Sequence, residues 1–149
     1  MKPIKIGIAG MGTVASGVVK VLERNQAEIT RRAGRGIEVA VVCERTPGRA
    51  AHLEERGVEV INDLSQLASH PDVDIVVELI GGYEPARSFV LEAIANGKHV
   101  VTANKALLAE HGNEIFQAAQ DKGVTVAFEA AVAGGIPVIK ALREGLSAN

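Results

Sequence analysis

The sequence predicts an α/β fold with a doubly wound parallel sheet. Short apolar runs rich in β-branched residues alternate with longer stretches of helical spacing, which is typical of βαβ units. The runs VAVVC and IVVELI are apolar at both alternating positions, as expected of strands that helices cover on both faces. No repeat, low-complexity segment or linker interrupts this pattern, so residues 1–149 are expected to form one domain.

The alternation predicts strands and crossover helices in a regular order. The expected strands cover residues 4–9, 37–43, 58–61, 73–80, 98–103 and 124–130. The expected helices cover residues 14–32, 47–57, 85–97, 104–123 and 136–146. Such an order favours a sheet arranged 3-2-1-4-5-6. A glycine stands between a helix and the next strand in several places, where a left-handed C-cap or a loop position favours it. These are Gly36, Gly57, Gly97 and Gly123.

Composition excludes several classes of protein. With 47% hydrophobic and 23% charged residues the chain is ordinary globular material, and its net charge of −2 disfavours nucleic acid or an anionic membrane as a partner. The single cysteine, Cys43, cannot form an internal disulfide and is expected to be a small buried residue. No segment has the features of a signal peptide or a membrane span. We therefore expect a soluble cytoplasmic protein.

The stretch GMGTVASG, residues 10–17, follows the first expected strand and opens the first expected helix. At this place backbone amides and the helix dipole can bind a pyrophosphate, with Gly10 making the tight turn and Gly12 admitting the phosphate. Ala15 stands at the third glycine position of the pattern, where any small residue allows close packing of helix and strand. The motif predicts a Rossmann-type dinucleotide-binding domain, although a plain strand-to-helix turn would use the same glycines.

The end of the second strand leaves the choice between NAD and NADP open. An acidic side chain there favours the ribose hydroxyls of NAD, and an arginine favours the 2′-phosphate of NADP. Glu44 and Arg45 stand side by side at this place, with Arg49 close behind. A solvated charge pair is the alternative interpretation for each residue.

Two further stretches follow strands that end at the same edge of the sheet. Gly81 and Gly82 come after the fourth strand, where the chain is expected to pass close to the cofactor. Asn104 and Lys105 begin the helix after the fifth strand. The positive end of a helix dipole and a neighbouring nicotinamide both disfavour an ammonium, which would suit Lys105 to proton transfer. The alternative is a surface lysine with a mobile side chain.

In this order and spacing, GMGTVASGVV, VVELIGG, VTANKALLAEHG and FEAAVAGGIPVIKALREGL resemble the N-terminal part of homoserine dehydrogenase. The resemblance covers essentially the whole chain, and the TANK and FEAAVAGGIP stretches carry most of its specificity. It implies an enzyme that interconverts L-homoserine and L-aspartate 4-semialdehyde with NAD or NADP, in threonine and methionine biosynthesis. By position, it implies that Thr13 and Val14 lie in the cofactor loop and that Lys105 is a cofactor-contacting and catalytic lysine.

The resemblance also implies a monovalent cation, commonly sodium. The positions that match the family's ligands are one glutamate and three main-chain carbonyls, at Glu129, Val132, Gly134 and Ile136. One carboxylate with neutral carbonyls suits a hard cation of low charge. A Glu129 carboxylate that only accepts loop amides is the alternative.

Members of the resembled family continue into a substrate-binding domain and, in many cases, a regulatory ACT domain. We therefore expect this chain to be an N-terminal part that is inactive alone, with a homo-oligomer formed at full length. Rival hypotheses are another NAD(P) reductase of amino-acid metabolism, such as an aspartate dehydrogenase or dihydrodipicolinate reductase, and a nucleotide-sensing module without catalysis. The TANK and AVAGGIP stretches argue against the two named reductases.

Overall fold

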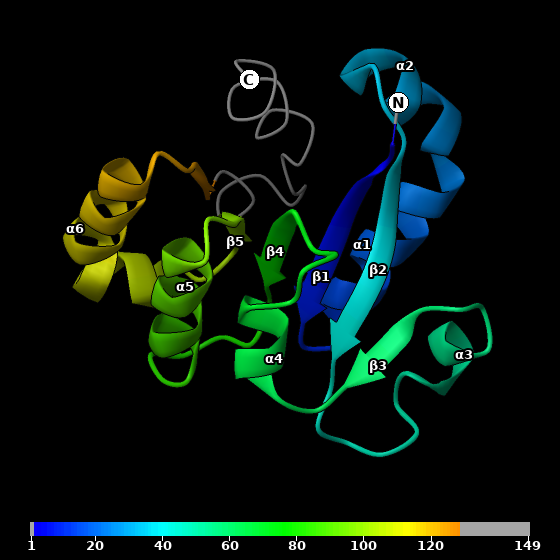
Figure 1. Ribbon diagram of the computed structural model, residues 1–149. Helices are drawn as coiled ribbons and strands as arrows, with labels where there is room; N and C mark the ends of the chain where they lie inside the picture. Colours follow the sequence, from blue (N-terminus) through cyan, green and yellow to red (C-terminus); the bar gives the residue numbers. More distant parts are fainter. Residues whose placement is uncertain (1, 129–149) are drawn as a thin grey trace.

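A computed structural model describes residues 2–128 of the chain. It contains a parallel sheet of six strands in the order β3-β2-β1-β4-β5-β6, which confirms the predicted topology (Figure 1). The strands are β1 (Ile4–Ala9), β2 (Ile37–Cys43), β3 (Glu59–Ile61), β4 (Ile75–Glu78), β5 (His99–Thr102) and β6 (Val126–Ala127). The described helices are α1 (Thr13–Arg24), α2 (Gln26–Ala33), α3 (Ala51–Glu54), α4 (Leu64–Ala68), α5 (Ala86–Ala95) and α6 (Lys105–Lys122).

Side chains of alternating parity divide the core into two layers, one on each face of the sheet. Ile6 and Ile8 of β1 belong to a cluster with buried residues of α1, α2 and α3. Val76 of β4 and Val100 of β5 belong to a second cluster, with buried residues of α4, α5 and α6. Both faces are therefore covered, as the doubly apolar strands predicted.

Several predicted boundaries were wrong. The single helix expected over 14–32 is two helices, because Asn25 leaves the helical conformation while its amide and its side-chain Nδ2 both donate to the Val21 carbonyl. The helix expected over 47–57 is reduced to α3, and the short helix α4 was not predicted. The helix expected over 136–146 lies outside the described residues.

The glycines expected between helices and strands have the left-handed conformation at three of the four positions. Gly57, Gly97 and Gly123 have φ values of 88°, 77° and 74°. The fourth, Gly36, is a loop residue without a positive φ, and the left-handed residue that ends α2 is Gly34, with φ 75°.

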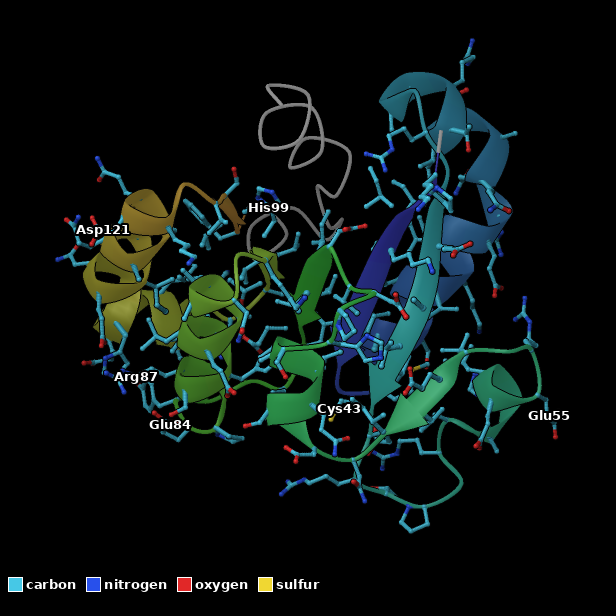
Figure 2. All side chains as sticks on the ribbon, viewed as in Figure 1. Cys43, Glu55, Glu84, Arg87, His99 and Asp121 are labelled. Atoms are coloured by element: carbon cyan, nitrogen blue, oxygen red, sulfur yellow. The ribbon has the colours of Figure 1, made fainter. Side chains whose placement is uncertain are left out.

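The ends of the sheet differ in chemistry. At the amino end, the buried Lys98 Nζ donates to the carbonyls of His70 (2.6 Å) and Val73 (2.7 Å). At the carboxyl end, Cys43 closes β2 as a buried free thiol, which confirms the predicted small core residue. Burial raises the pKa of Cys43 to about 11. Figure 2 labels Cys43 and His99, the residue after Lys98, at these opposite ends of the sheet.

One glycine of α1 is free of any packing requirement. Gly17 lies inside the helix, is exposed, and a Cβ built on it would meet no atom within 4 Å. Since glycine destabilises a helix interior by about 1 kcal/mol relative to alanine, Gly17→Ala should stabilise the protein by roughly that amount. Urea unfolding measures the change.

Gly10→Ala is the matched control. Gly10 has φ +98°, and a Cβ there would lie 3.2 Å from the Leu79 carbonyl oxygen. This substitution should destabilise the protein by about 1 kcal/mol or more, because the backbone of an alanine is strained at a positive φ. A loss of stability in Gly17→Ala would contradict the assignment of Gly17 as unconstrained.

Candidate functional site

The glycine loop lies where the sequence predicted, between β1 and α1. The Gly10 amide donates to the Cys43 carbonyl of the neighbouring strand at 3.0 Å. Its positive φ and its close approach to Leu79 explain this glycine by the fold alone. Ala15 is 1% exposed and packs in the core, as the third position of the motif requires.

Gly12 has no such explanation in the fold. Its φ of −83° is available to any residue, and a Cβ there would meet no atom within 4 Å. Gly12 caps α1, whose first turn carries no acidic side chain, and Thr13 and Val14 are exposed beside it. The open space and the unpaired amides of a helix start are what a phosphate group needs.

A cleft of about 270 Å³ opens at this loop. It brings together four of the predicted site residues, Gly10, Gly12, Glu44 and Arg45, with Arg49. The remaining lining residues are Met11, Cys43, Leu64, Leu79, Ile80 and Pro85. The cleft thus joins the glycine loop, the end of β2 and the loop after β4 at the carboxyl edge of the sheet.

Glu44 and Arg45 differ in their surroundings. The Glu44 side chain is only 8% exposed, accepts a hydrogen bond from the Thr46 amide at 2.9 Å and lies 3.8 Å from the Arg49 guanidinium. Burial raises the pKa of Glu44, but the Thr46 amide, the Arg49 charge and the Met11 amide outweigh it and lower the pKa below its ordinary value. Glu44 is therefore an ionised carboxylate at neutral pH, whereas Arg45 is exposed beside it.

The loop after β4 is held by a carboxylate that the sequence analysis missed. Glu78 is fully buried, and its Oε2 accepts hydrogen bonds from the amides of Ile80 (2.8 Å) and Gly81 (3.1 Å). Its Oε1 accepts the Thr102 hydroxyl at 2.8 Å. The available signal was a single charge in the otherwise apolar run VVELI. Gly81 and Gly82 follow with φ values of +82° and +71° and are exposed.

Asn104 and Lys105 begin α6 as predicted. Asn104 is the N-cap: its Oδ1 accepts the Leu107 amide at 3.0 Å, and its Nδ2 donates to the Gly82 carbonyl at 2.6 Å. Lys105 is the first residue of the helix and is exposed. The structure thus brings Asn104 to the Gly81–Gly82 loop.

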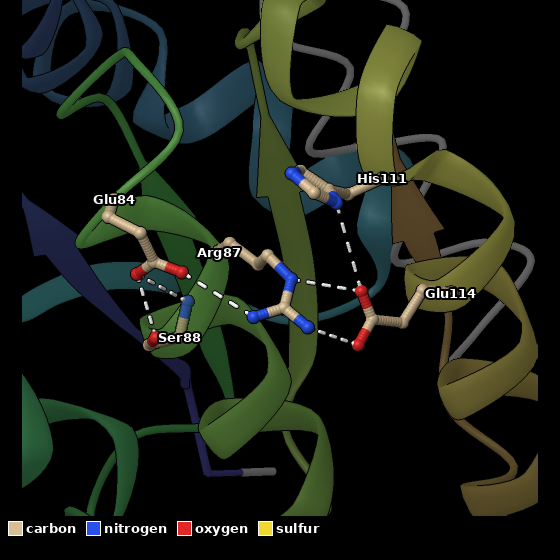
Figure 3. A network of polar contacts seen from close by, with 5 residues as sticks. All are labelled: Glu84, Arg87, Ser88, His111 and Glu114. Carbon is tan, nitrogen blue, oxygen red and sulfur yellow. Dashed lines mark hydrogen bonds and ion pairs between the residues drawn. The ribbon is translucent and has the colours of Figure 1, made fainter.

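A second polar network joins the start of α5 to α6 (Figure 3). Arg87 Nε donates to Glu114 Oε2 at 2.9 Å, and its Nη1 lies 3.5 Å from Glu84. Glu84 also accepts the Ser88 hydroxyl at 2.7 Å, and His111 lies 3.9 Å from Glu114. The Arg87 side chain is 32% exposed and the two glutamates are more so, so this network braces two helices at the surface.

Another cavity lies away from all these residues. It has a volume of about 570 Å³ and is lined by residues 37–41 of β2 and by Glu59, the β3 partner of Val41. None of the predicted site residues borders it. Because dinucleotides bind at the carboxyl edge of such sheets, we assign the site to the smaller cleft.

The predicted cation ligands, Glu129, Val132, Gly134 and Ile136, lie outside the described residues. Among residues 2–128, no group of three or more His, Cys, Asp and Glu side chains is placed to hold a metal ion. Within the same part of the chain, no helix is long and apolar enough to cross a membrane.

Comparisons with known proteins agree with this geometry. Residues 10–129 match the family model described as homoserine dehydrogenase, NAD binding domain. The chain is 62% identical over its whole length to homoserine dehydrogenase of Pseudomonas aeruginosa, of which it covers 34%. Its fold is similar to a crystal structure of a homoserine dehydrogenase from Thiobacillus denitrificans, with a TM-score of 0.85, 60% identity, and coverage of 100% of this chain and 34% of that one.

A more distant structure gives the same answer. The homoserine dehydrogenase of S. aureus matches with a TM-score of 0.80 and 36% identity, over 89% of this chain and 33% of that one. The chain thus spans about one third of the length of these relatives. The glycine loop, the sheet and these similarities together show that the chain belongs to the homoserine dehydrogenase family and carries its NAD-binding domain.

Proposed function

We propose that this chain is the NAD(P)-binding part of a homoserine dehydrogenase that interconverts L-homoserine and L-aspartate 4-semialdehyde by hydride transfer. The observation that carries the proposal is the cleft at the carboxyl edge, where Gly12 leaves open space at the start of α1. Family membership supplies the substrate class. The single buried cysteine supports a cytoplasmic location, and the family supports a homo-oligomer at full length.

In this proposal the residues of the chain bind and orient the two reactants. Gly12, Thr13 and Val14 offer backbone amides to the pyrophosphate, and Glu44 with Arg45 faces the adenosine ribose. The nicotinamide supplies the hydride chemistry when it is bound. Lys105, exposed at the start of α6, holds the substrate hydroxyl and takes part in the transfer of the hydroxyl proton. A substrate-binding domain beyond this chain completes the site.

The first prediction of this proposal concerns the choice of cofactor. Arg45 is exposed at the cleft and a guanidinium pairs with a phosphate in bidentate fashion, so both cofactors should bind with a modest preference for NADP. Arg45→Ala should weaken NADP binding by about tenfold, the equivalent of one charge-assisted hydrogen bond, and leave NAD binding within about twofold. Isothermal titration calorimetry with each nucleotide measures both affinities.

Arg24→Ala is the control, since Arg24 is exposed at the opposite end of α1. It should change neither affinity. Two results together would show that Arg45 does not recognise the 2′-phosphate. NADP would bind no more tightly than NAD, and Arg45→Ala would bind each nucleotide as tightly as the unsubstituted protein does.

The second prediction concerns catalysis. The 149-residue chain should bind nucleotide without turning over homoserine, because hydride transfer needs the substrate held against the nicotinamide. In the full-length protein, Lys105→Ala should lower kcat by about 10²- to 10⁴-fold, the usual contribution of general acid–base assistance. Homoserine-dependent reduction of NADP measures kcat, and circular dichroism tests folding.

Lys122→Ala is the matched control, because Lys122 is the last residue of the same helix. It should retain the activity of the unsubstituted protein. Turnover by the 149-residue chain would contradict the proposal. So would a Lys105→Ala protein whose kcat is within about threefold of the unsubstituted value, since that difference is less than about 1 kcal/mol in activation free energy.

We also propose, from the family resemblance alone, that sodium binds Glu129 and the carbonyls of Val132, Gly134 and Ile136. A crystal structure of the full-length protein grown in sodium should show an ion with oxygen ligands at about 2.4 Å. Glu129→Ala should remove the ion and lower activity. Oxygen distances typical of a bound water, together with full activity in Glu129→Ala, would contradict the proposal.

A further inference from the structure

Glu78 carries a buried charge at the end of β4. The carboxylate is fully buried, and no ion pair within residues 2–128 includes it. A carboxylate in such a position is costly unless hydrogen bonds replace its hydration. The amides of Ile80 and Gly81 and the hydroxyl of Thr102 do so, at 2.8, 3.1 and 2.8 Å.

Those bonds lead to the start of α6. Thr102 Oγ1 donates to Glu78 and also accepts the Asn104 amide at 3.1 Å. Asn104 in turn caps α6 and binds the Gly82 carbonyl. The carboxylate is therefore joined through the Thr102 hydroxyl to Asn104, the residue before Lys105, and directly to the Gly81–Gly82 loop.

Lys98 shows that a buried charge alone does not imply such a role. It too is buried and ties segments together, through the carbonyls of His70 and Val73. It lies at the opposite end of β5, where none of the predicted site residues is found. Glu78 and Lys98 thus share a stabilising role and differ in what they hold in place.

We infer that Glu78 and Thr102 are positioning residues, which fix the start of α6 and the Gly81–Gly82 loop at the nicotinamide end of the cofactor site. The inference rests on the proposed function for its catalytic part. Glu78 orders the loop against which the nucleotide binds, and Thr102 transmits that order to Asn104 and so to Lys105. Neither side chain needs to contact a reactant.

The test uses paired variants of the full-length protein. Thr102→Val keeps the β-branched shape and removes the hydroxyl, so kcat should fall about tenfold, the equivalent of one hydrogen bond to a charged group, while the NADPH Kd stays within about threefold. Thr102→Ser keeps the hydroxyl and should restore kcat to within about twofold of the unsubstituted protein. Glu78→Gln keeps the volume and should weaken NADPH binding about tenfold.

Lys98→Met is the control for lost stability. It removes the buried ammonium and should lower Tm as much as Thr102→Val or more, while kcat and the NADPH Kd per folded protein stay unchanged. All rates are taken well below each Tm. A Thr102→Val protein with unchanged kcat, or a Lys98→Met protein with an equal loss of kcat, would reduce Glu78 and Thr102 to general stabilising residues.

The two proposals fail in different ways. If the full-length protein binds NADPH but does not oxidise homoserine, the proposed function is wrong, and the NADPH affinity of Glu78→Gln still decides whether Glu78 orders the nucleotide loop. An unchanged affinity in Glu78→Gln overturns the inference even if homoserine is oxidised. A full-length protein that binds neither NADH nor NADPH overturns both.

Discussion

Because helices cover both faces of the sheet, every buried polar side chain of the described residues lies at the end of a strand or just beyond it. Glu78 ends β4, Thr102 ends β5 and Asn104 follows it, while Lys98 and His99 stand at the start of β5. The middle of each strand is apolar on both sides, since a polar group there would have neither water nor a loop to bind. The fold thus confines its chemistry to the two edges of the sheet.

The polarity of a parallel sheet then decides which edge can take which charge. At the carboxyl edge the chain leaves the strands, and the first amides of loops and helices point back toward the sheet; they hold the Glu78 carboxylate, and α1 and α6 both begin there. At the amino edge the same polarity offers carbonyls, and these hold the Lys98 ammonium. An anionic dinucleotide fits the edge that offers amides and the positive ends of two helix dipoles.

Strong local patterns made the topology, the turn at Gly10, the packing of Ala15 and the start of α6 at Lys105 predictable. The break at Asn25 was missed because the helical spacing runs through it without glycine or proline. Glu78 and Thr102 were missed because each ends an apolar strand, and their pairing depends on the register of β4 with β5, in which they are partners. A charge at the end of a doubly apolar strand is the signal that could have found Glu78.

The sequence alone did not decide whether Glu44 or Arg45 faces the ribose, because the two residues are neighbours in the chain. The structure separates them by environment. The Glu44 side chain is only 8% exposed and is ionised, and it already accepts the Thr46 amide and lies beside the Arg49 guanidinium. One carboxylate with two guanidinium groups leaves a net charge of about +1 at this end of the cleft. This positive charge would neutralise part of the charge of a 2′-phosphate. The ribose hydroxyls of NAD would instead have to donate hydrogen bonds to Glu44, whose carboxylate already accepts the Thr46 amide. This charge balance is the physical basis of the NADP preference that we propose.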